Sequence, residues 1–392
     1  MTLRTLKQIK NLKNRKVLVR VGFDCPIKNG KVINDSRIRQ VLPTINYLIN
    51  KKARIILISH LGRPQGKRVK KYSLEPVAKI LKKEIKDFRF IRTPIGSNLK
   101  EKIDQVKAGK VILLENIRFY PEEEKNDVKF AKRLADLADI YVNEAFSTCH
   151  RWHSSINAVA EYLPSYAGFV LEKEVKNLSL FLKKPKHPLV VLMGGKKIET
   201  KIKPIKNLLK NADRVLIAGS LASNFLKAAG YEIGKSFFEP EMIKTTRQLL
   251  KNKKIVLPFD VKIKEKTQSL MVNVGELAGL GKNFEILDIG PGTAKMFEKY
   301  LENAKMIFWN GPMGYFEDER FIQGTTSITR AVLSNRKARI VIGGGDTLAA
   351  LTQLTNYQVN RLTNIFISSG GGAMLDFFAG KVLPGIKPLI ID

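Results

Sequence analysis

Two lysines near the middle of the chain stand where binding of phosphate is expected. Leu189–Met193 is an apolar run typical of a buried parallel strand, Gly194 and Gly195 end it, and Lys197 and Lys201 follow four residues apart. That spacing predicts that both ammonium groups share one face of a helix. A helix that starts after two glycines binds phosphate through its free backbone amides and its dipole. A glycine turn before an ordinary solvated lysine helix is the alternative interpretation.

Cationic side chains follow several predicted strands in the first half of the chain. Because ligands bind beyond the carboxyl ends of parallel strands, these side chains are expected at one edge of a sheet. Arginine forks match the geometry of phosphate and carboxylate, so several directed at one cleft suit a small substrate with several negative charges. One arginine alone is more often part of a surface ion pair. The set is Arg37, His60, Arg63, Arg118 and Arg151.

Glycine-rich turns follow the predicted strands of the second half. Glycine lets the backbone approach a ligand closely, so several such turns predict a nucleotide-binding surface. Any single turn is weak evidence, since glycine also ends strands for steric reasons. Asp346 follows three glycines and precedes a predicted helix, and it is the candidate Mg²⁺ ligand. The candidate nucleotide-binding residues in these turns are Gly195, Gly219, Gly292, Asn310, Pro312, Gly344, Gly345, Asp346 and Thr347.

An arginine-lined half and a glycine-lined half together predict phosphoryl transfer across a cleft that closes. That chemistry depends on positioning and on neutralising spread negative charge, and it needs no covalent nucleophile. No G-x-G-x-x-G opens the first strand–helix unit, which argues against a dinucleotide-dependent dehydrogenase.

Alternating strands and helices must position these residues. Helix-patterned stretches such as 73–83, 128–138 and 220–229 separate short apolar runs, which predicts right-handed strand–helix–strand units and parallel sheets. We therefore expect an α/β chain with two doubly wound, Rossmann-like domains at 1–170 and 189–375, joined by a hinge helix at 171–188. The predicted strands are 17–21, 54–58, 88–91, 111–114, 140–142, 189–193, 215–218, 255–257, 286–289, 306–309, 340–342 and 365–367.

Composition limits the class of protein. A chain of 392 residues exceeds the size of one typical core, which agrees with two domains. Lys and Arg number 69 against 36 Asp and Glu, and the resulting net charge of +33 attracts anions, including nucleic acid. The basic residues are spread along the chain and form no basic block. We interpret them as surface chemistry and expect no specific nucleic-acid site.

The remaining composition points to an ordinary intracellular protein. Cys25 and Cys149 lie far apart, which favours reduced thiols. His150 and His153 are three residues apart with no third ligand nearby, so we expect no metal site there. No apolar run reaches the roughly 20 residues that span a bilayer. The start of the chain lacks the apolar core of a signal peptide, and we expect a cytoplasmic location.

A series of motifs follows one order along the chain. The motifs are DSRIRQVLPTI, SHLGRP, LLENIRF, FSTCHR, GGKKIETK, LDIGPGT, WNGPMGYFE, GGGDT and SSGGGAMLDFFAGKVLPG. In this order they resemble the phosphoglycerate kinase family, from about Lys16 to Pro384. The resemblance implies reversible transfer of a phosphoryl group from 1,3-bisphosphoglycerate to ADP, giving 3-phosphoglycerate and ATP. It further implies Mg²⁺, direct in-line transfer on domain closure, and a monomer without a membrane partner.

The resemblance also implies roles for individual residues. Arg37 and Lys197 fall on positions that meet the transferred group, Lys201 on one that meets a nucleotide phosphate, and Glu317 on one that contacts the ribose. Residues 376–392 are implied to return to the first domain. The positions that match the substrate-binding residues are Gly22, Phe23, Asp24, Arg37, His60, Leu61, Gly62, Arg63, Arg118 and Arg151.

Some positions depart from the family's pattern. Gly22 and Asp24 stand where the family has aspartate and asparagine, Glu144 stands for an aspartate, and Ser147 stands for a glycine. We expect Asp24 to assume part of the missing acceptor role, so that combining Gly22→Asp with Asp24→Asn lowers the KM for 3-phosphoglycerate. A second hypothesis is a binding protein with a weakened pocket, whose charge recruits nucleic acid or an acidic partner.

Overall fold

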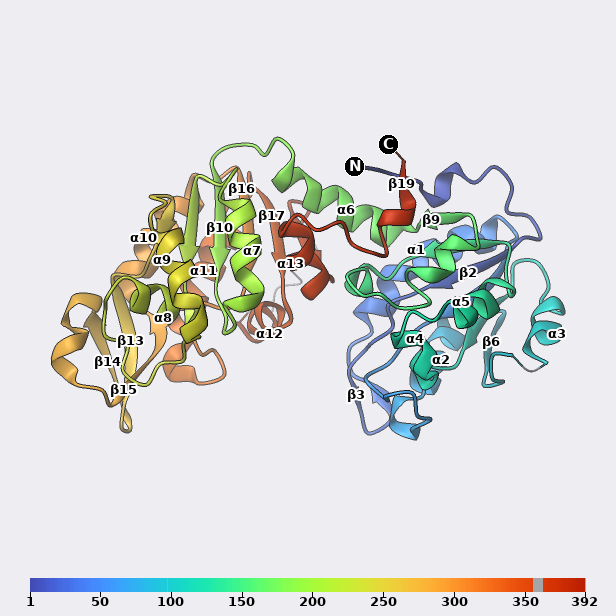
Figure 1. Cartoon of the computed structure of the whole chain (residues 1–392), viewed down its shortest axis with the longest axis horizontal. Helices are drawn as coiled ribbons and strands as arrows, with labels where there is room; N and C mark the ends of the chain where they lie inside the picture. Colours follow the sequence, from blue (N-terminus) through green and yellow to red (C-terminus); the bar gives the residue numbers. More distant parts are fainter. Residues whose placement is uncertain (97, 355–361, 392) are drawn as a thin grey trace. The chain divides into compact units, whose positions relative to one another are not determined.

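The chain divides into two compact units in a computed structural model that describes residues 1–96, 98–354 and 362–391 (Figure 1). The first unit comprises Met1–Lys176 and Val382–Asp392, and the second comprises Asn177–Lys381. The division falls inside α6 (Phe169–Leu182), which overlaps the hinge helix expected at 171–188. Asp392, the end of the expected C-terminal segment, lies outside the described residues.

The first unit is a doubly wound parallel sheet. Its six strands run in the order β6-β7-β5-β2-β8-β9, and every neighbouring pair is parallel. The strands are β2 (Lys16–Arg20), β5 (Arg54–Ile58), β6 (Phe88–Ile91), β7 (Val111–Leu114), β8 (Ile140–Asn143) and β9 (Ser165–Ala167). The helices are α1 (Ser36–Asn50), α2 (Glu75–Glu84), α3 (Leu99–Asp104), α4 (Pro121–Glu124) and α5 (Val128–Ala135).

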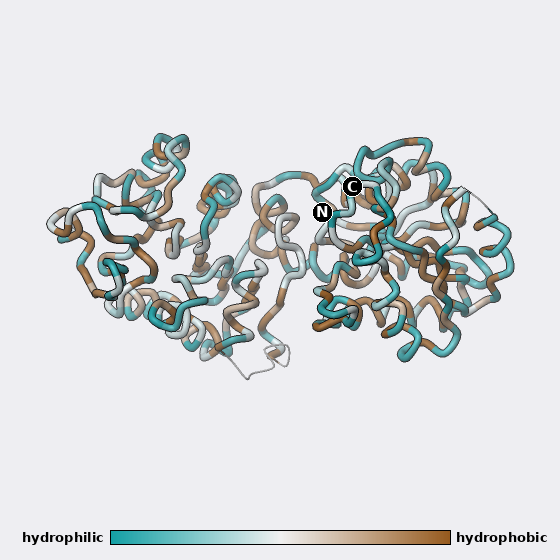
Figure 2. Tube along the Cα trace, turned by 90° about the horizontal axis from the view of Figure 1, so that it is seen from below, coloured by the Kyte–Doolittle hydropathy of each residue, from teal (hydrophilic) through white to brown (hydrophobic). Residues whose placement is uncertain are grey.

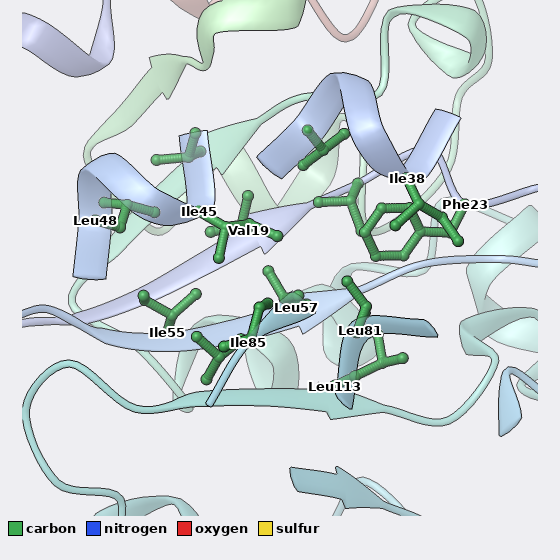
Figure 3. Close-up of a cluster of buried hydrophobic side chains, with 14 of the residues drawn as sticks. Val19, Phe23, Ile38, Ile45, Leu48, Ile55, Leu57, Leu81, Ile85 and Leu113 are labelled. Atoms are coloured by element: carbon green, nitrogen blue, oxygen red, sulfur yellow. The ribbon is translucent and has the colours of Figure 1, made fainter. Parts of the chain in front are cut away.

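Alternation along the strands builds a core on each face of this sheet. Val17 and Val19 of β2 join α1 and α2 in one buried cluster, while Leu18 joins α3 and α5 in another. Successive side chains of a strand point to opposite faces, so a central strand covered on both faces is apolar along most of its length. Figure 3 shows the first cluster, in which Ile38 and Ile45 of α1 lie over the sheet. In Figure 2 hydrophobic stretches lie inside this unit, and most of its outer loops are hydrophilic.

The second unit repeats the architecture with a different strand order. Its parallel sheet has the order β12-β11-β10-β16-β17-β18. The strands are β10 (Leu189–Met193), β11 (Arg214–Ile217), β12 (Ile255–Val256), β16 (Met306–Asn310), β17 (Arg339–Gly343) and β18 (Ile365–Ser368). The helices are α7 (Glu199–Leu208), α8 (Gly219–Ala228), α9 (Ile243–Leu250), α10 (Pro291–Glu302), α11 (Gln323–Ser334), α12 (Gly345–Leu354) and α13 (Gly372–Phe378).

A separate antiparallel sheet corrects one strand prediction. Residues 286–289, expected in the parallel sheet, belong to β15 (Phe284–Ile289). β15 pairs antiparallel with β13 (Asp260–Glu265), which also pairs with β14 (Gln268–Asn273). Most of the buried apolar side chains of these strands form a small cluster with Leu226 of α8, while Ile289 joins the core beside the parallel sheet. A short apolar run does not indicate which sheet it joins.

The end of the described chain belongs to the first unit. β19 (Ile390–Ile391) pairs antiparallel with β1 (Thr2–Leu3). Upstream of β19, Asn143 Nδ2 donates to Gly385 O at 3.0 Å, and Gly385 N donates to Cys149 O at 2.9 Å. This segment therefore supports the loop that follows β8. No helix among the described residues has the length and apolar character needed to cross a membrane.

Candidate active site

The carboxyl ends of β2, β5 and β8 meet at the switch point of the first sheet. The chain leaves β2 toward β5 on one side and reaches β8 on the other, so the loops after these strands diverge and leave room for a ligand. Gly22 follows β2, His60 follows β5, and Arg151 follows β8. The topology thus brings together the candidate residues that the sequence placed at strand ends.

A buried arginine that the sequence analysis missed organises this group. Arg20, the last residue of β2, is fully buried; its Nε donates to Ser155 Oγ at 2.9 Å, and its Nη2 lies 3.1 Å from His60 Nδ1. Ser155 Oγ in turn donates to Glu123 at 2.6 Å. Burial, followed by the charges of Arg20 and Arg118, holds the pKa of His60 well below its usual value. His60 is therefore neutral near pH 7.

Arg118 extends the cationic group from the end of β7. It lies in the 3₁₀ turn Ile117–Phe119, donates through Nη1 to Gly62 O at 2.8 Å, and has Nε 3.2 Å from Glu124 Oε1. Burial and the charge of Arg20 lower the pKa of Arg118 to about 10. Its Nη2 is buried without a hydrogen-bond partner among the described residues. An anion that reached this guanidinium would therefore gain an unopposed donor.

Asp24 and Arg37 are tied to the same loops. Asp24 Oδ1 accepts from Gly62 N at 2.9 Å, and Oδ2 lies 3.6 Å from His60 Nε2. The half-buried Arg37 donates through Nη1 to Asp24 O at 3.0 Å. One carboxylate oxygen of Asp24 is thus engaged in holding the loop after β5. The hypothesis that Asp24 accepts from a substrate stays a prediction.

Three further substrate-binding candidates of the first unit, Phe23, Leu61 and Arg63, lie outside the buried group around Arg20. Phe23 is completely buried in the core beneath α1, and Leu61 is 4% exposed in the same cluster, so their side chains do not belong to the site (Figure 3). Any contact of these two residues with a substrate would have to come from their backbone, and their assignment to the site stays a prediction. Arg63 is exposed, beyond the buried part of the group. His153, for which the sequence predicted no role in metal binding, is buried. Burial and the charge of Arg118 lower the pKa of His153 to about 3.

The switch point of the second sheet lies at the end of β10. β10 lies between β11 and β16 in the sheet, and the loops after these three strands pack closely. Gly194 N donates to Asn310 O at 2.9 Å, and Gly219 N donates to Met313 O at 2.9 Å. A Cβ at Gly194 would lie 2.0 Å from Pro312 O. Here glycine is required by packing between loops, which is the steric alternative considered from the sequence.

Lys197 and Lys201 do not share a helical face. α7 begins only at Glu199, whose amide donates to Glu239 Oε2 at 2.8 Å, so Lys197 lies before the helix and is exposed. Lys201 is 7% exposed, and its Nζ donates to Gly194 O. Burial lowers the pKa of Lys201 to about 8, and the charge of Asp346 partly opposes this shift. The prediction of a shared face is therefore wrong.

A pocket of about 490 Å³ opens beside these loops. Five of its lining residues are sequence candidates, namely Gly195, Gly219, Pro312, Glu317 and Asp346. Phe237, Tyr315 and Phe316 add aromatic surface, which suits a base or another flat ring. A larger cavity of about 740 Å³ lies over β6 and α2 in the first unit, away from the candidate residues.

The first turn of α12 offers donors for an anion. The opening amides of an α-helix have no acceptor within the helix, and α12 begins at Gly345 and includes the exposed Asp346. A Cβ at Gly345 would meet nothing within 4 Å. Thr347 is buried and engaged, since its Oγ1 accepts from Gly311 N at 2.7 Å. Gly344, with φ of +106°, would bring a Cβ within 2.7 Å of Asn310 Nδ2, and that amide donates to Gly343 O at 2.7 Å.

The backbone amide of Gly292 is engaged in a hydrogen bond within the protein. Its amide donates to Asp260 Oδ2 at 2.9 Å, and the amide of Thr293 donates to Asp260 Oδ1 at 2.6 Å, so a carboxylate already covers the start of α10. A Cβ at Gly292 would lie 2.6 Å from the Phe259 ring. The geometry thus explains this glycine without a nucleotide.

The comparisons with known proteins agree with this architecture. A sequence model described as phosphoglycerate kinase matches residues 6–381. The chain is 41% identical to the phosphoglycerate kinase of Coprothermobacter proteolyticus over 100% of both chains, and 44% identical to that of Dictyoglomus turgidum over 97% of this chain and 96% of the relative. The phosphoglycerate kinase structure from Coxiella burnetii superposes with a TM-score of 0.87 at 39% identity, covering 99% of this chain and 98% of that one. The corresponding structure from Pyrococcus horikoshii gives 0.84 at 32% identity, with the same coverage.

Proposed function

Because the chain belongs to the phosphoglycerate kinase family, we propose that it transfers a phosphoryl group reversibly between 1,3-bisphosphoglycerate and ADP, giving 3-phosphoglycerate and ATP. It is a phosphotransferase, as its relatives are along the full length of the chain. The observation that carries the site assignment is the pair of buried arginines, Arg20 and Arg118, with the neutral His60 beside them at the first switch point. Glu124 and Glu123 offset part of their charge, but Arg118 Nη2 stays a buried donor without a partner among the described residues, and an anion bound beside it would satisfy that donor.

The first unit binds the phosphoglycerate in this proposal. Arg118, Arg151 and the exposed Arg63 supply forks for its phosphate and carboxylate, while neutral His60 accepts or donates one hydrogen bond. Arg37 faces the group that moves. Gly22, Asp24 and Gly62 shape the backbone around the substrate. Arg20 orients His60 through the contact between its Nη2 and His60 Nδ1.

The second unit binds the nucleotide in this proposal. Glu317 and the aromatic residues of the pocket contact the nucleoside, and Gly195, Gly219 and Pro312 form its floor. The amides at the start of α12 and the ammonium of Lys201 bind phosphate oxygens, and Lys197 meets the transferred group. Asn310, Gly344 and Thr347 fix the loops, and Gly292 is left out because Asp260 occupies its amide.

The donor set fits Mg²⁺. Asp346 is exposed in the first turn of α12, and the described residues contain no group of three or more metal-binding side chains. One carboxylate suits Mg²⁺, which keeps several waters and takes further oxygens from substrate phosphates. When bound, the ion would offset negative charge on the phosphates. We further expect that the two units close about α6 for direct transfer, and that the protein acts as a cytoplasmic monomer.

A coupled assay with ATP and 3-phosphoglycerate tests the proposal. Arg37→Ala and Lys197→Ala should each lower kcat by about 100-fold or more, because each removes a charge that stabilises the moving group. Lys203→Ala, an exposed lysine on α7, is the matched control and should be neutral. Chelation of Mg²⁺ should abolish turnover, and Asp346→Asn should raise the Mg²⁺ concentration needed. Absence of turnover in the wild type would favour the binding-protein hypothesis.

A further inference from the structure

Gly22 leaves room for a small group beside the loop that follows β8. A Cβ built at Gly22 would lie 3.7 Å from Ser147 Oγ and 3.9 Å from Ala145 Cα, which are ordinary contact distances. Gly22 does not have a positive φ. Neither crowding nor backbone conformation therefore requires glycine at this position, and the missing side chain leaves room next to the Ser147 hydroxyl.

The Ser147 hydroxyl is available to a ligand. Ser147 lies in the 3₁₀ turn Phe146–Thr148, and it is half-buried between two buried neighbours. Thr148 Oγ1 donates back to Ala145 O at 3.0 Å. For Ser147 Oγ, the described part of the chain provides no hydrogen-bond partner. A half-buried hydroxyl without a protein partner is satisfied by water or by a bound molecule.

The surroundings of Ser147 are cationic. Arg20 precedes Gly22 by two residues, and Arg151 follows Ser147 in the same loop, with its amide donating to Thr148 O at 3.0 Å. Arg20 and Arg151 both act electrostatically on His60, which places them around one site. Ser147 thus offers a neutral hydrogen-bonding group at the edge of a group of positive charges.

Asp24 is less suited to contact a neutral substrate group. Its Oδ1 is engaged by the amide of Gly62 at 2.9 Å, and its Oδ2 lies 3.6 Å from His60 Nε2. Using Asp24 for a substrate would compete with these contacts. Ser147 Oγ would not have to give up a hydrogen bond to the described part of the chain in order to bind the substrate.

We propose that Ser147 Oγ hydrogen-bonds the hydroxyl group of phosphoglycerate in the space above Gly22, an inference that rests on the proposed function. Phosphoglycerate carries a phosphate and a carboxylate, which suit arginine forks, and one neutral hydroxyl, which needs a different partner. Ser147 is then a specificity-determining residue, and the absence of a side chain at Gly22 makes room for the contact.

Steady-state kinetics of Ser147→Ala give the first test. The KM for 3-phosphoglycerate should rise about fivefold to tenfold, as expected for one lost hydrogen bond, and the KM for ATP should not change. Ser147→Thr keeps the hydroxyl and should retain most of the affinity. Ser334→Ala, an exposed serine at the end of α11, is the control and should change neither KM. An unchanged KM for 3-phosphoglycerate in Ser147→Ala would overturn the inference.

A substrate analogue separates this contact from a structural role. We would measure binding of 3-phosphoglycerate and of 3-(phosphonooxy)propanoate, which lacks the hydroxyl, by calorimetry. Ser147→Ala should weaken only the hydroxylated ligand, so the ratio of the two affinities should fall about fivefold. Equal weakening of both ligands would mean that Ser147 merely supports the loop, and would overturn the inference. Since this assay needs no turnover, failure of the proposed function is seen separately, as an inactive wild type in the coupled assay.

Rescue gives a third readout. Because a Cβ at Gly22 meets only ordinary contacts, Gly22→Ser places a new hydroxyl in the same space. Added to Ser147→Ala, this substitution should restore part of the lost affinity for 3-phosphoglycerate and leave that for the analogue unchanged. A double variant as weak as Ser147→Ala, with an unchanged thermal unfolding temperature, would count against the shared space.

Discussion

Replacing Lys201 by methionine should stabilise the protein while impairing catalysis. The side chain is 7% exposed, and burial lowers its pKa from 10.5 to about 8. At about 1.4 kcal/mol per pKa unit, the charged form costs the folded state about 3 kcal/mol at neutral pH. Methionine removes that cost and keeps the length of the chain, but it leaves Gly194 O without its donor, a loss of about 1–2 kcal/mol. We therefore expect Lys201→Met to raise the free energy of unfolding by about 1–2 kcal/mol near pH 7.

The pH dependence makes this reasoning testable. Between about pH 8 and 10.5 the unfolded wild type binds more protons at Lys201 than the folded one does, so this residue makes wild-type stability rise with pH in that window. The difference in free energy of unfolding between Lys201→Met and the wild type should therefore decrease as the pH rises through this window. Urea unfolding of both proteins from about pH 7 to pH 9.5 measures the difference, with Lys203→Met as the exposed control on the same helix. A variant that is less stable at pH 7, or a difference that does not vary with pH, would refute the argument.

Two further perturbations test other parts of the structure. Glu144 is buried, and burial raises its pKa from 4.5 to about 7, so the folded state keeps a proton that the unfolded state releases above about pH 4.5. The stability of the wild type should therefore fall as the pH rises through this window. Urea unfolding between about pH 5 and pH 8 should show a loss of free energy of unfolding about 2 kcal/mol larger in the wild type than in Glu144→Gln. Equal pH profiles would contradict the raised pKa. Gly194→Ala places a Cβ 2.0 Å from Pro312 O and should cost about 2 kcal/mol or more in thermal unfolding, whereas Gly275→Ala, with nothing within 4 Å, should cost little.

The positions of the parallel strands follow from local sequence. A strand buried on both faces is apolar at most of its positions, and runs such as Leu189–Met193 and Val111–Leu114 show this pattern without any knowledge of their partners. The candidate residues after those strands were found for the same reason, because parallel strands end at one edge. Residues 286–289 joined a different sheet, because strand pairing depends on long-range partners that an apolar run does not reveal.

The errors at the site arise from contacts between distant parts of the chain. Arg20 ends an apolar strand, and its role depends on Ser155, which lies 135 residues away. The start of α7 at Glu199 is fixed partly by Glu239, so spacing alone placed Lys197 wrongly on a helix. An arginine in the last position of a buried strand was the one local signal, since such a charge needs partners.

The unit that begins the chain is completed by residues that are translated much later. β19 supplies the partner of β1, and Gly385 donates to Cys149 O in the loop that carries Arg151. The second unit, Asn177–Lys381, is continuous and holds all of its own strands. The parallel sheet of the first unit is complete in sequence at Ala167, but residues 382–391 can support its anion-binding loop only after the entire second unit has been translated.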